Sequence, residues 1–434
     1  MTCTLDREGN RYIMRCARKR YSEEVRRRAE EVISSLDITA SNDTKILEAA
    51  RKVAAGMEKE ILEYIRDNVL GLGPLAPLMS VPEVEDISVV SFREPVFVYH
   101  RDLGYIPTDI TFQSEVELAE FIKSIVERSG KQISISDPVV DVSLPDGSRL
   151  QATLGTSVTS EGPSLAIRKF RKDPVTPLDI IRQEGASSDL MAYLWLLVSR
   201  GANILVCGGT GTGKTTFLNA LMSFIPENLR VITIEETREI EYPGENVLPL
   251  VTRQGIGRDT EVDAYSLLSI ALRHRPNYIV LGEVRGEEAF SLFQAMSAGR
   301  YVMATFHAGS ISTVVHRLEA RPLSIPRNML TALHCIVLLS SELGHGGTRR
   351  FVSSVYEVMG LDRDTGELLV NRAFSRENGT YSFSRASYAL RRLADATGTT
   401  EPELMADMKR RSQFLSSLQA GNMREFMAKV SSFL

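Results

Sequence analysis

The spacing of apolar positions along the first seventy residues predicts helices. Over residues 21–36 and 46–70, apolar residues recur every three or four positions between many charged ones, which is the pattern of helices with one buried face. Asn42 and Asp43 provide a break and a helix cap between the two segments. Glycines and a proline at 71–74 end the pattern. Residues 1–72 are therefore predicted to form an N-terminal helical region.

The next hundred residues change to short apolar runs separated by turns. Strands are predicted at 87–90, 96–99, 139–144 and 150–154, a helix is predicted at 115–129, and Pro145-Asp146-Gly147-Ser148 is a strong turn signal between two of the strands. This mixture predicts a small α+β domain over residues 73–170. Pro174 and Pro177 then indicate a linker at 171–187.

From residue 188 onward, helices and apolar strands alternate. Helices are predicted at 190–198 and 214–224, and strands at 204–207, 231–234, 278–281 and 302–308. Such alternation predicts an α/β domain with a parallel, doubly wound sheet at 188–345. Short strands at 351–358 and 367–370, followed by a charged helical tail, predict a C-terminal segment at 346–434.

Composition is that of an ordinary globular protein. Lysine plus arginine number 51 against 55 aspartate plus glutamate in 434 residues, a formal net charge of −4, which argues against a basic nucleic-acid coat protein. Four cysteines (Cys3, Cys16, Cys207 and Cys335) lie far apart, which disfavours a disulfide framework and a zinc site and fits a reducing cytoplasm. Without a long apolar run or a signal peptide, we expect a soluble, intracellular protein.

A glycine-rich segment after the strand at 204–207 matches the phosphate-binding motif G-x-x-x-x-G-K-[ST]. Its glycines let backbone N–H groups turn toward phosphate oxygens, Lys214 supplies positive charge, and the hydroxyl of Thr215 can bind Mg²⁺. A non-functional glycine turn is disfavoured, because a strand precedes the loop and a helix follows it. The predicted nucleotide-binding residues are Gly208, Gly209, Thr210, Gly211, Thr212, Gly213, Lys214, Thr215 and Thr216.

Two later strands end in carboxylates. The strand at 231–234 runs into Glu235 and Glu236, and the strand at 278–281 leads to Glu283. We expect these side chains beside the phosphate loop, because ligands of parallel α/β sheets bind at the carboxyl ends of the strands. One carboxylate can hold Mg²⁺ while another orients or deprotonates water. His307 ends the next strand and is a candidate sensor of the γ-phosphate, although a lone histidine there is more often structural.

Together, these motifs resemble the secretion ATPases of type II and type IV systems, which include pilus motors and conjugation-type ATPases. The resemblance rests on the phosphate loop, TIEETRE at 233–239, IVLGEVR at 279–285 and TFHA at 305–308, and it spans about residues 60–390. GEVRG at 282–286, LFQAM at 292–296, YHR at 99–101, LPDGSR at 144–149 and IRKF at 167–170 are most similar to the archaeal branch, which drives archaella and archaeal type IV pili. The resemblance to this family implies a RecA-like P-loop ATPase domain, preceded by a smaller domain that covers the nucleotide. It also implies a homohexameric ring that uses ATP and Mg²⁺.

The resemblance also implies roles for arginines. Arg149 and Arg168 match the arginines that the small domain and linker offer to the phosphates, where a guanidinium stabilises the charge of the transferring phosphoryl group. Two positions depart from the family pattern. Glu236 stands where aspartate is common, and Arg300 stands where the histidine segment usually has its first histidine, so that Arg300 becomes a candidate phosphate contact.

The sequence thus predicts an ATPase at the inner face of the cytoplasmic membrane. Lys214 and Thr215 hold phosphate and magnesium, Glu283 supports the metal, and Glu235 activates water. Motion between the domains passes through a polytopic membrane platform protein to pilin-like subunits of a type IV pilus, an archaellum or a secretion pseudopilus.

Two alternatives remain open. A RecA-like nucleic-acid translocase is disfavoured by the near-neutral charge, so no nucleic-acid partner is expected. A non-hydrolysing nucleotide-binding scaffold is disfavoured by the intact Lys214, Glu235 and Glu283. Basic residues between Arg18 and Arg28 form either a solvated helix face or a contact for an anionic membrane surface or an acidic partner.

Overall fold

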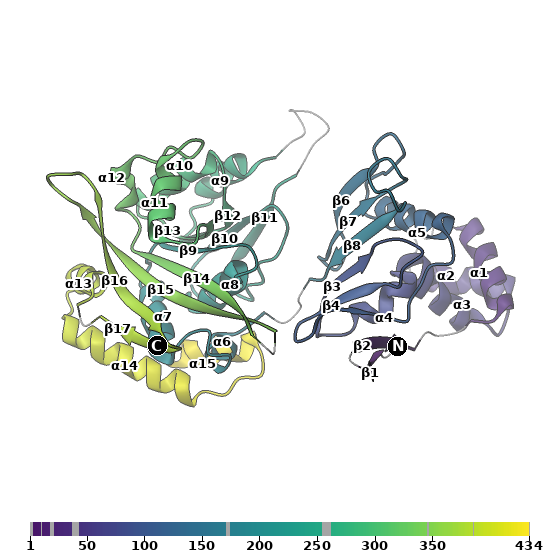
Figure 1. The fold of residues 1–434 in the computed structure, drawn as a ribbon, viewed down its shortest axis with the longest axis horizontal. Helices are drawn as coiled ribbons and strands as arrows, with labels where there is room; N and C mark the ends of the chain where they lie inside the picture. Colours follow the sequence, from purple (N-terminus) through teal and green to yellow (C-terminus); the bar gives the residue numbers. More distant parts are fainter. Residues whose placement is uncertain are drawn as a thin grey trace. The chain divides into compact units, whose positions relative to one another are not determined.

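The computed structural model divides the chain into two compact units, Met1–Arg171 and Lys172–Leu434 (Figure 1). It describes residues 3–9, 11–17, 21–36, 43–170, 174–253, 262–344, 347–384 and 386–433. Each unit has its own sheet and its own hydrophobic core, and the two are described in turn.

The N-terminal unit combines a hairpin, a group of helices and a six-stranded sheet. Its elements are β1 (Cys3–Glu8), β2 (Arg11–Cys16), α1 (Glu23–Ser35), α2 (Asp43–Val53), α3 (Glu58–Tyr64), the π-helical segment η1 (Ile65–Leu70), the 3₁₀ turn η2 (Gly73–Leu75), α4 (Ala76–Met79), β3 (Val84–Val89), β4 (Phe97–His100), β5 (Gly104–Pro107), α5 (Glu115–Arg128), β6 (Val139–Ser143), β7 (Arg149–Thr153) and β8 (Ser164–Arg168).

The six-stranded sheet has the order β5-β4-β3-β8-β7-β6, and its neighbouring strands are antiparallel. Burial alternates along its strands, so one face is apolar and the other is partly wet. Leu118, Ile122 and Ile125 of α5 join the apolar face in one core, and Ser114 caps this helix by accepting a hydrogen bond from the Glu117 N–H (3.1 Å). The opposite face is left to polar and charged side chains.

Residues 3–8 and 11–16 differ from the prediction of helix. They form the hairpin β1–β2, a separate two-stranded sheet that touches the chain just after β5 through a single bridge, where the Asp109 N–H donates to the Met14 carbonyl (3.1 Å). Cys3 and Cys16 are register partners and form a disulfide, with Cα atoms 4.0 Å apart. The sequence spacing disfavoured a disulfide, and this prediction was wrong because a hairpin brings residues 13 positions apart directly opposite each other.

The helices α1, α2 and α3 pack around a small core of their own, which includes Val25, Val32 and Ile61. The predicted helix over 46–70 is interrupted after α2, where Gly56 adopts a left-handed φ of 95° that glycine adopts without strain. Asn42 and the basic residues 18–20 lie outside the described residues.

The C-terminal unit is built on a nine-stranded sheet. Its elements are α6 (Pro177–Arg182), α7 (Ser188–Ser199), β9 (Ile204–Gly208), α8 (Lys214–Met222), β10 (Val231–Glu235), β11 (Val247–Val251), α9 (Ala264–Arg273), β12 (Tyr278–Val284), α10 (Glu288–Ser297), β13 (Tyr301–His307), α11 (Ile311–Glu319), α12 (Arg327–Leu330), β14 (Cys335–Gly344), β15 (Gly347–Leu361), β16 (Leu368–Glu377), β17 (Thr380–Phe383), α13 (Tyr388–Thr397), α14 (Glu401–Ser417) and α15 (Met423–Phe433).

This sheet has the order β11-β10-β12-β13-β9-β14-β15-β16-β17. The strands from β11 to β14 are parallel, and the last three are antiparallel additions. Both faces are covered, because Ile204 and Val206 of β9 enter the core with α7 and α8, whereas Leu205 and Cys207 enter the core with α9, α10 and α11. The predicted class, a RecA-like P-loop domain with a mostly parallel sheet, is confirmed.

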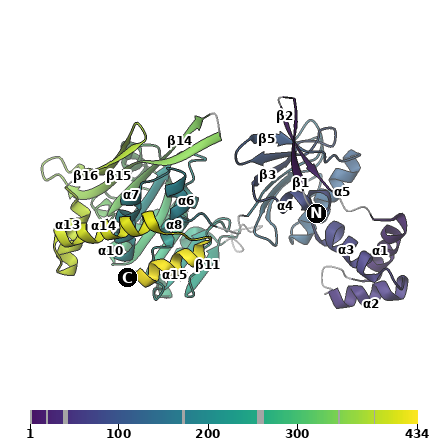
Figure 2. The same ribbon diagram turned by 90° about the horizontal axis from the view of Figure 1, so that it is seen from below.

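The C-terminal helices cover α7, and Figure 2 shows α14 running along it. Residues 190–198 of α7 are buried on all sides, because this helix packs between the sheet and the C-terminal helices. The guanidinium of Arg411 lies 4.4 Å from the ring centre of Trp195. Among the described residues, no helix combines the length and the apolar character needed to cross a membrane.

Candidate nucleotide-binding site

The candidate site lies where neighbouring parallel strands of the larger sheet end. β9 ends at Gly208, the first residue of the phosphate loop, and its register partner on β13 is His307. On the other side of β13, β12 and β10 are paired at Leu281 and Ile234, just before their acidic residues. The topology therefore brings the loop, the acids and the histidine to one edge of one sheet, as the sequence predicts.

Glycines are required at three positions of the phosphate loop. Gly211 and Gly213 have φ of 76° and 84°, a left-handed conformation that other residues adopt at a cost. A Cβ on Gly208 would lie 2.4 Å from the hydroxyl oxygen of Thr212 and 3.0 Å from the carbonyl oxygen of Leu339. The loop is thus folded tightly around itself before it enters α8.

The side chains of the loop converge on one carbonyl. The ammonium of Lys214 and the hydroxyl of Thr212 both donate to the carbonyl of Gly209 at 2.9 Å. Burial lowers the pKa of Lys214, and the nearby carboxylate of Glu283 opposes this shift. Thr215 is partly buried in the first turn of α8.

The N–H groups of the loop point to no internal acceptor. Within the described residues, no hydrogen-bond acceptor is found for the amides of Gly211, Thr212 and Gly213. Unpaired amides at the start of a helix form the type of site that binds phosphate.

Glu235 is buried, with 4% of its surface exposed. Its Oε1 accepts hydrogen bonds from the N–H groups of Glu239 (2.9 Å) and Ile240 (2.7 Å). Its Oε2 is buried and has no partner within the described residues. Burial is the main cause that raises the pKa of Glu235 to about 7. The carboxyl group can therefore exchange a proton near neutral pH.

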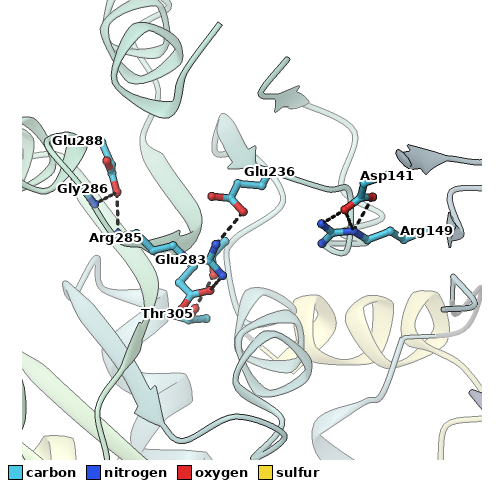
Figure 3. A network of polar contacts seen from close by, with 9 residues as sticks. Asp141, Arg149, Glu236, Glu283, Arg285, Gly286, Glu288 and Thr305 are labelled. Carbon is cyan, nitrogen blue, oxygen red and sulfur yellow. Dashed lines mark hydrogen bonds and ion pairs between the residues drawn. The ribbon is translucent and has the colours of Figure 1, made fainter. Parts of the chain in front are cut away.

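Glu236 and Glu283 share a single arginine (Figure 3). Arg285 donates from Nη1 to Glu236 Oε2 (2.9 Å) and from Nη2 to Glu283 Oε2 (2.6 Å). Glu288 holds the turn that follows, because its Oε1 accepts from the N–H groups of Arg285 (2.7 Å) and Gly286 (2.8 Å). The two acids predicted from strand ends are thus neighbours through one guanidinium.

His307 is held through its backbone. Arg317 donates to the His307 carbonyl, and its guanidinium lies 5.2 Å from the ring centre of Phe306. Arg300 sits at the other end of the same strand and donates to the carbonyl of Pro276 (3.2 Å). Seven strand residues span about 20 Å. The suggestion that Arg300 contacts phosphate is therefore wrong, because β13 runs parallel to β9 and its start lies at the far edge.

Arg149 and Arg168 belong to the N-terminal unit. They are register partners on β7 and β8, and both are exposed on the wet face of the small sheet. The guanidinium of Arg149 forms an ion pair with Asp141 (Figure 3). Their approach to a nucleotide stays a prediction.

The residues present fit a magnesium ion bound together with phosphates. Mg²⁺ commonly takes one or two protein ligands, with phosphate and water completing the shell. The hydroxyl of Thr215 and the 27% exposed carboxylate of Glu283 would provide such ligands. In the described part of the chain, no group of three or more His, Cys, Asp or Glu residues could hold a metal by itself.

Sequence reasoning missed Arg350 of β15, whose Nε donates to the Gly211 carbonyl of the phosphate loop (2.8 Å). No local motif marks this arginine. Its position depends on the pairing of β14 with β9 and of β15 with β14, which a single sequence does not reveal.

Comparison with known proteins gives the family. A model of the family described as "Type II/IV secretion system protein" matches residues 72–387. An uncharacterized protein of Methanocaldococcus jannaschii is 33% identical over 85% of this chain and 68% of its own length. The type IV secretion system protein PtlH of Bordetella pertussis is 34% identical over 50% of this chain and 75% of its own.

Among solved structures, the VirB11 ATPase of the Brucella suis type IV secretion system is 26% identical, with a TM-score of 0.35, over 69% of this chain and 96% of its own. The family match includes parts of both described units and the whole phosphate loop with its acidic strands. The chain therefore belongs to the type II/IV secretion system protein family.

Proposed function

We propose that this chain hydrolyses ATP as the motor for assembly of a type IV pilus-like filament, an archaellum or a secretion pseudopilus. The carrying observation is the edge of the larger sheet, where Gly208 and His307 are register partners and Glu283 lies near Lys214. Membership of the secretion family and the likeness to PtlH support the same function.

The proposed reaction uses the residues of this edge in distinct roles. Lys214 and the free amides of the loop bind the phosphates of ATP. Thr215 and Glu283 would hold Mg²⁺, which would neutralise phosphate charge. Glu235, with a pKa raised to about 7 by burial, accepts the proton of the attacking water. His307 contacts the γ-phosphate, and Glu236 balances the charge of Arg285.

Arg285 joins the two acids of this edge. Its Nη2 donates to Oε2 of Glu283 (2.6 Å) and its Nη1 to Oε2 of Glu236 (2.9 Å). A magnesium ion held by Glu283 would add positive charge beside this guanidinium, which is 59% exposed, and Glu236 would keep the guanidinium paired.

The larger assembly is part of the proposal. Subunits form a homohexamer, and closure of the N-terminal unit brings Arg149 and Arg168 to the phosphates. The ring acts at the inner face of the membrane on a polytopic platform protein, and through it on pilin-like subunits.

The experiment that tests this function is Lys214→Ala in the purified full chain. Loss of the ammonium should abolish ATP hydrolysis, whereas Lys429→Ala, which removes an exposed lysine paired with Glu425, should not. In cells, Lys214→Ala should prevent filament assembly or secretion. Undiminished turnover would contradict the site, and strong stimulation of the wild type by DNA would favour the translocase alternative.

A further inference from the structure

Arg350 lies across the phosphate loop, outside every motif that defines it. Its Nε donates to the carbonyl of Gly211 at 2.8 Å. Its Cδ lies 3.2 Å from the place that a Cβ on Gly213 would occupy. The aliphatic part of the side chain therefore covers Gly213, while the guanidinium reaches Gly211.

This contact fixes the orientation of the peptide group between Gly211 and Thr212. In a planar trans peptide, the C=O of one residue and the N–H of the next point in opposite directions. Because Arg350 holds the Gly211 carbonyl, the Thr212 N–H points away from the Arg350 guanidinium. That amide has no acceptor among the described residues.

The strand under Arg350 is itself firmly held. Arg350 is the register partner of Ser341 on β14, and β14 pairs with β9 up to Gly208. Two residues further on, the Val352 N–H donates to the Gly185 carbonyl (2.8 Å). The preceding arginine, Arg349, instead pairs with Glu184, because successive side chains of a strand point to opposite faces.

We propose that Arg350 is a positioning residue for the nucleotide, which aims the Thr212 amide at phosphate by holding the other end of the same peptide group. This role rests on the proposed function of the loop. Donors fixed in advance bind charge better than donors that must reorganise.

The test is Arg350→Gln, with ADP binding and ATP hydrolysis measured separately. A charge-assisted hydrogen bond of this kind corresponds to about 10- to 100-fold in affinity. The Kd for ADP and the KM for ATP should rise by that factor. The kcat should change by less than about threefold, because the contact goes to the loop and not to the transferring phosphoryl group.

Two further variants separate positioning from packing. Arg350→Lys keeps the charge and loses the planar fork, and it should recover part of the lost affinity. Arg349→Gln removes the neighbouring arginine with its Glu184 ion pair, and it should bind ADP like the wild type. Thermal unfolding without nucleotide checks that each variant folds, and Arg350→Lys carries the test if Arg350→Gln does not fold.

The outcomes are distinct. Wild-type ADP affinity in Arg350→Gln would overturn the positioning role and leave the proposed function intact. Equal weakening by Arg350→Gln and Arg349→Gln would also overturn it, because packing of β15 would then be the cause. A wild-type chain that binds no ADP would overturn the proposed function and this role together.

Discussion

The smaller sheet is buried on one face, whereas the larger sheet is buried on both. This difference determines where each sheet can present functional side chains. Along β7 of the antiparallel sheet, Leu150 and Ala152 are buried while Arg149 and Gln151 are exposed. Every residue of β9 and β10 in the larger sheet is buried. A sheet covered on one face can present charges anywhere on the other, whereas a sheet covered on both faces presents chemistry at its strand ends.

The same difference sets how far water reaches the charged groups. Arg149 and Asp141 on the small sheet are 46% and 38% exposed, so water screens their ion pair. Glu235 at the end of β10 is buried, and its pKa rises to about 7. The proposed function accordingly assigns proton transfer to the strand ends and charge stabilisation to the open face.

The largest effect after loss of Lys214 is expected from Glu235→Gln. The amide keeps an acceptor for the N–H groups of Glu239 and Ile240 but cannot take a proton. Turnover should fall by about 10²- to 10⁴-fold, with ADP binding retained. Glu236→Gln is the matched control, since Glu236 contacts Arg285 on the surface and its loss should have a much smaller effect. The reverse order in an ATPase assay would move the base to Glu236.

A smaller loss of turnover is expected when the arginines on the exposed face of the six-stranded sheet are removed. Arg149→Ala with Arg168→Ala should lower kcat by on the order of 10²-fold, less than the 10³ to 10⁵ known for single arginine fingers, because two side chains share the role. The control is Arg93→Ala, which removes another exposed arginine of the same unit, paired with Glu161. Normal turnover in the double variant would confine catalysis to the larger sheet.

The raised pKa of Glu235 should also make the free energy of unfolding depend on pH. A carboxyl group whose pKa rises from 4.5 to about 7 on folding stabilises the folded state below pH 4.5, and this contribution is lost as pH rises through 7. Glu235→Gln does not titrate. Between pH 4.5 and 7, the free energy of unfolding of Glu235→Gln should therefore increase by up to about 3 kcal/mol relative to that of the wild type. Urea unfolding at several pH values measures this difference. A constant difference would mean that folding leaves the pKa of Glu235 unchanged.

Patterns of short range were enough to predict much of the larger sheet and the phosphate loop. Strands such as β9 are continuous apolar runs, and the glycines of the loop have a fixed spacing before Lys214. The acids were predictable because parallel strands end together. Arg350 was not, because its place depends on strand pairing far along the chain.

The prediction of helix at the N-terminal hairpin was wrong for a related reason. Residues 3–16 alternate charged and apolar positions too briefly to separate a strand from a helix. The two strands pair with each other, and Met14 forms one bridge to Thr108. The disulfide between Cys3 and Cys16 follows from that pairing, and spacing alone could not reveal it.

The smallest effect is expected from α1, which lies outside both sheets. Its Arg26, Arg27 and Arg28 were candidates for contact with an anionic surface, but the same helix carries Glu23, Glu24, Glu30 and Glu31, and Arg28 bonds to Glu31 (3.1 Å). Reversing the three arginines to glutamate should leave ATP hydrolysis unchanged. Binding to vesicles that contain anionic lipid should weaken only at low salt, since each cation near such a surface is worth about 1 kcal/mol and is screened over about 10 Å at 0.1 M salt. Arg51→Glu, which changes an arginine that is 79% exposed on α2, is the control for nonspecific loss of charge. Vesicle binding that is unchanged at every salt concentration would make α1 a solvated face. A loss of ATP hydrolysis would instead mean that α1 contributes to catalysis, and it would contradict the proposal that catalysis depends on the residues of the two sheets alone.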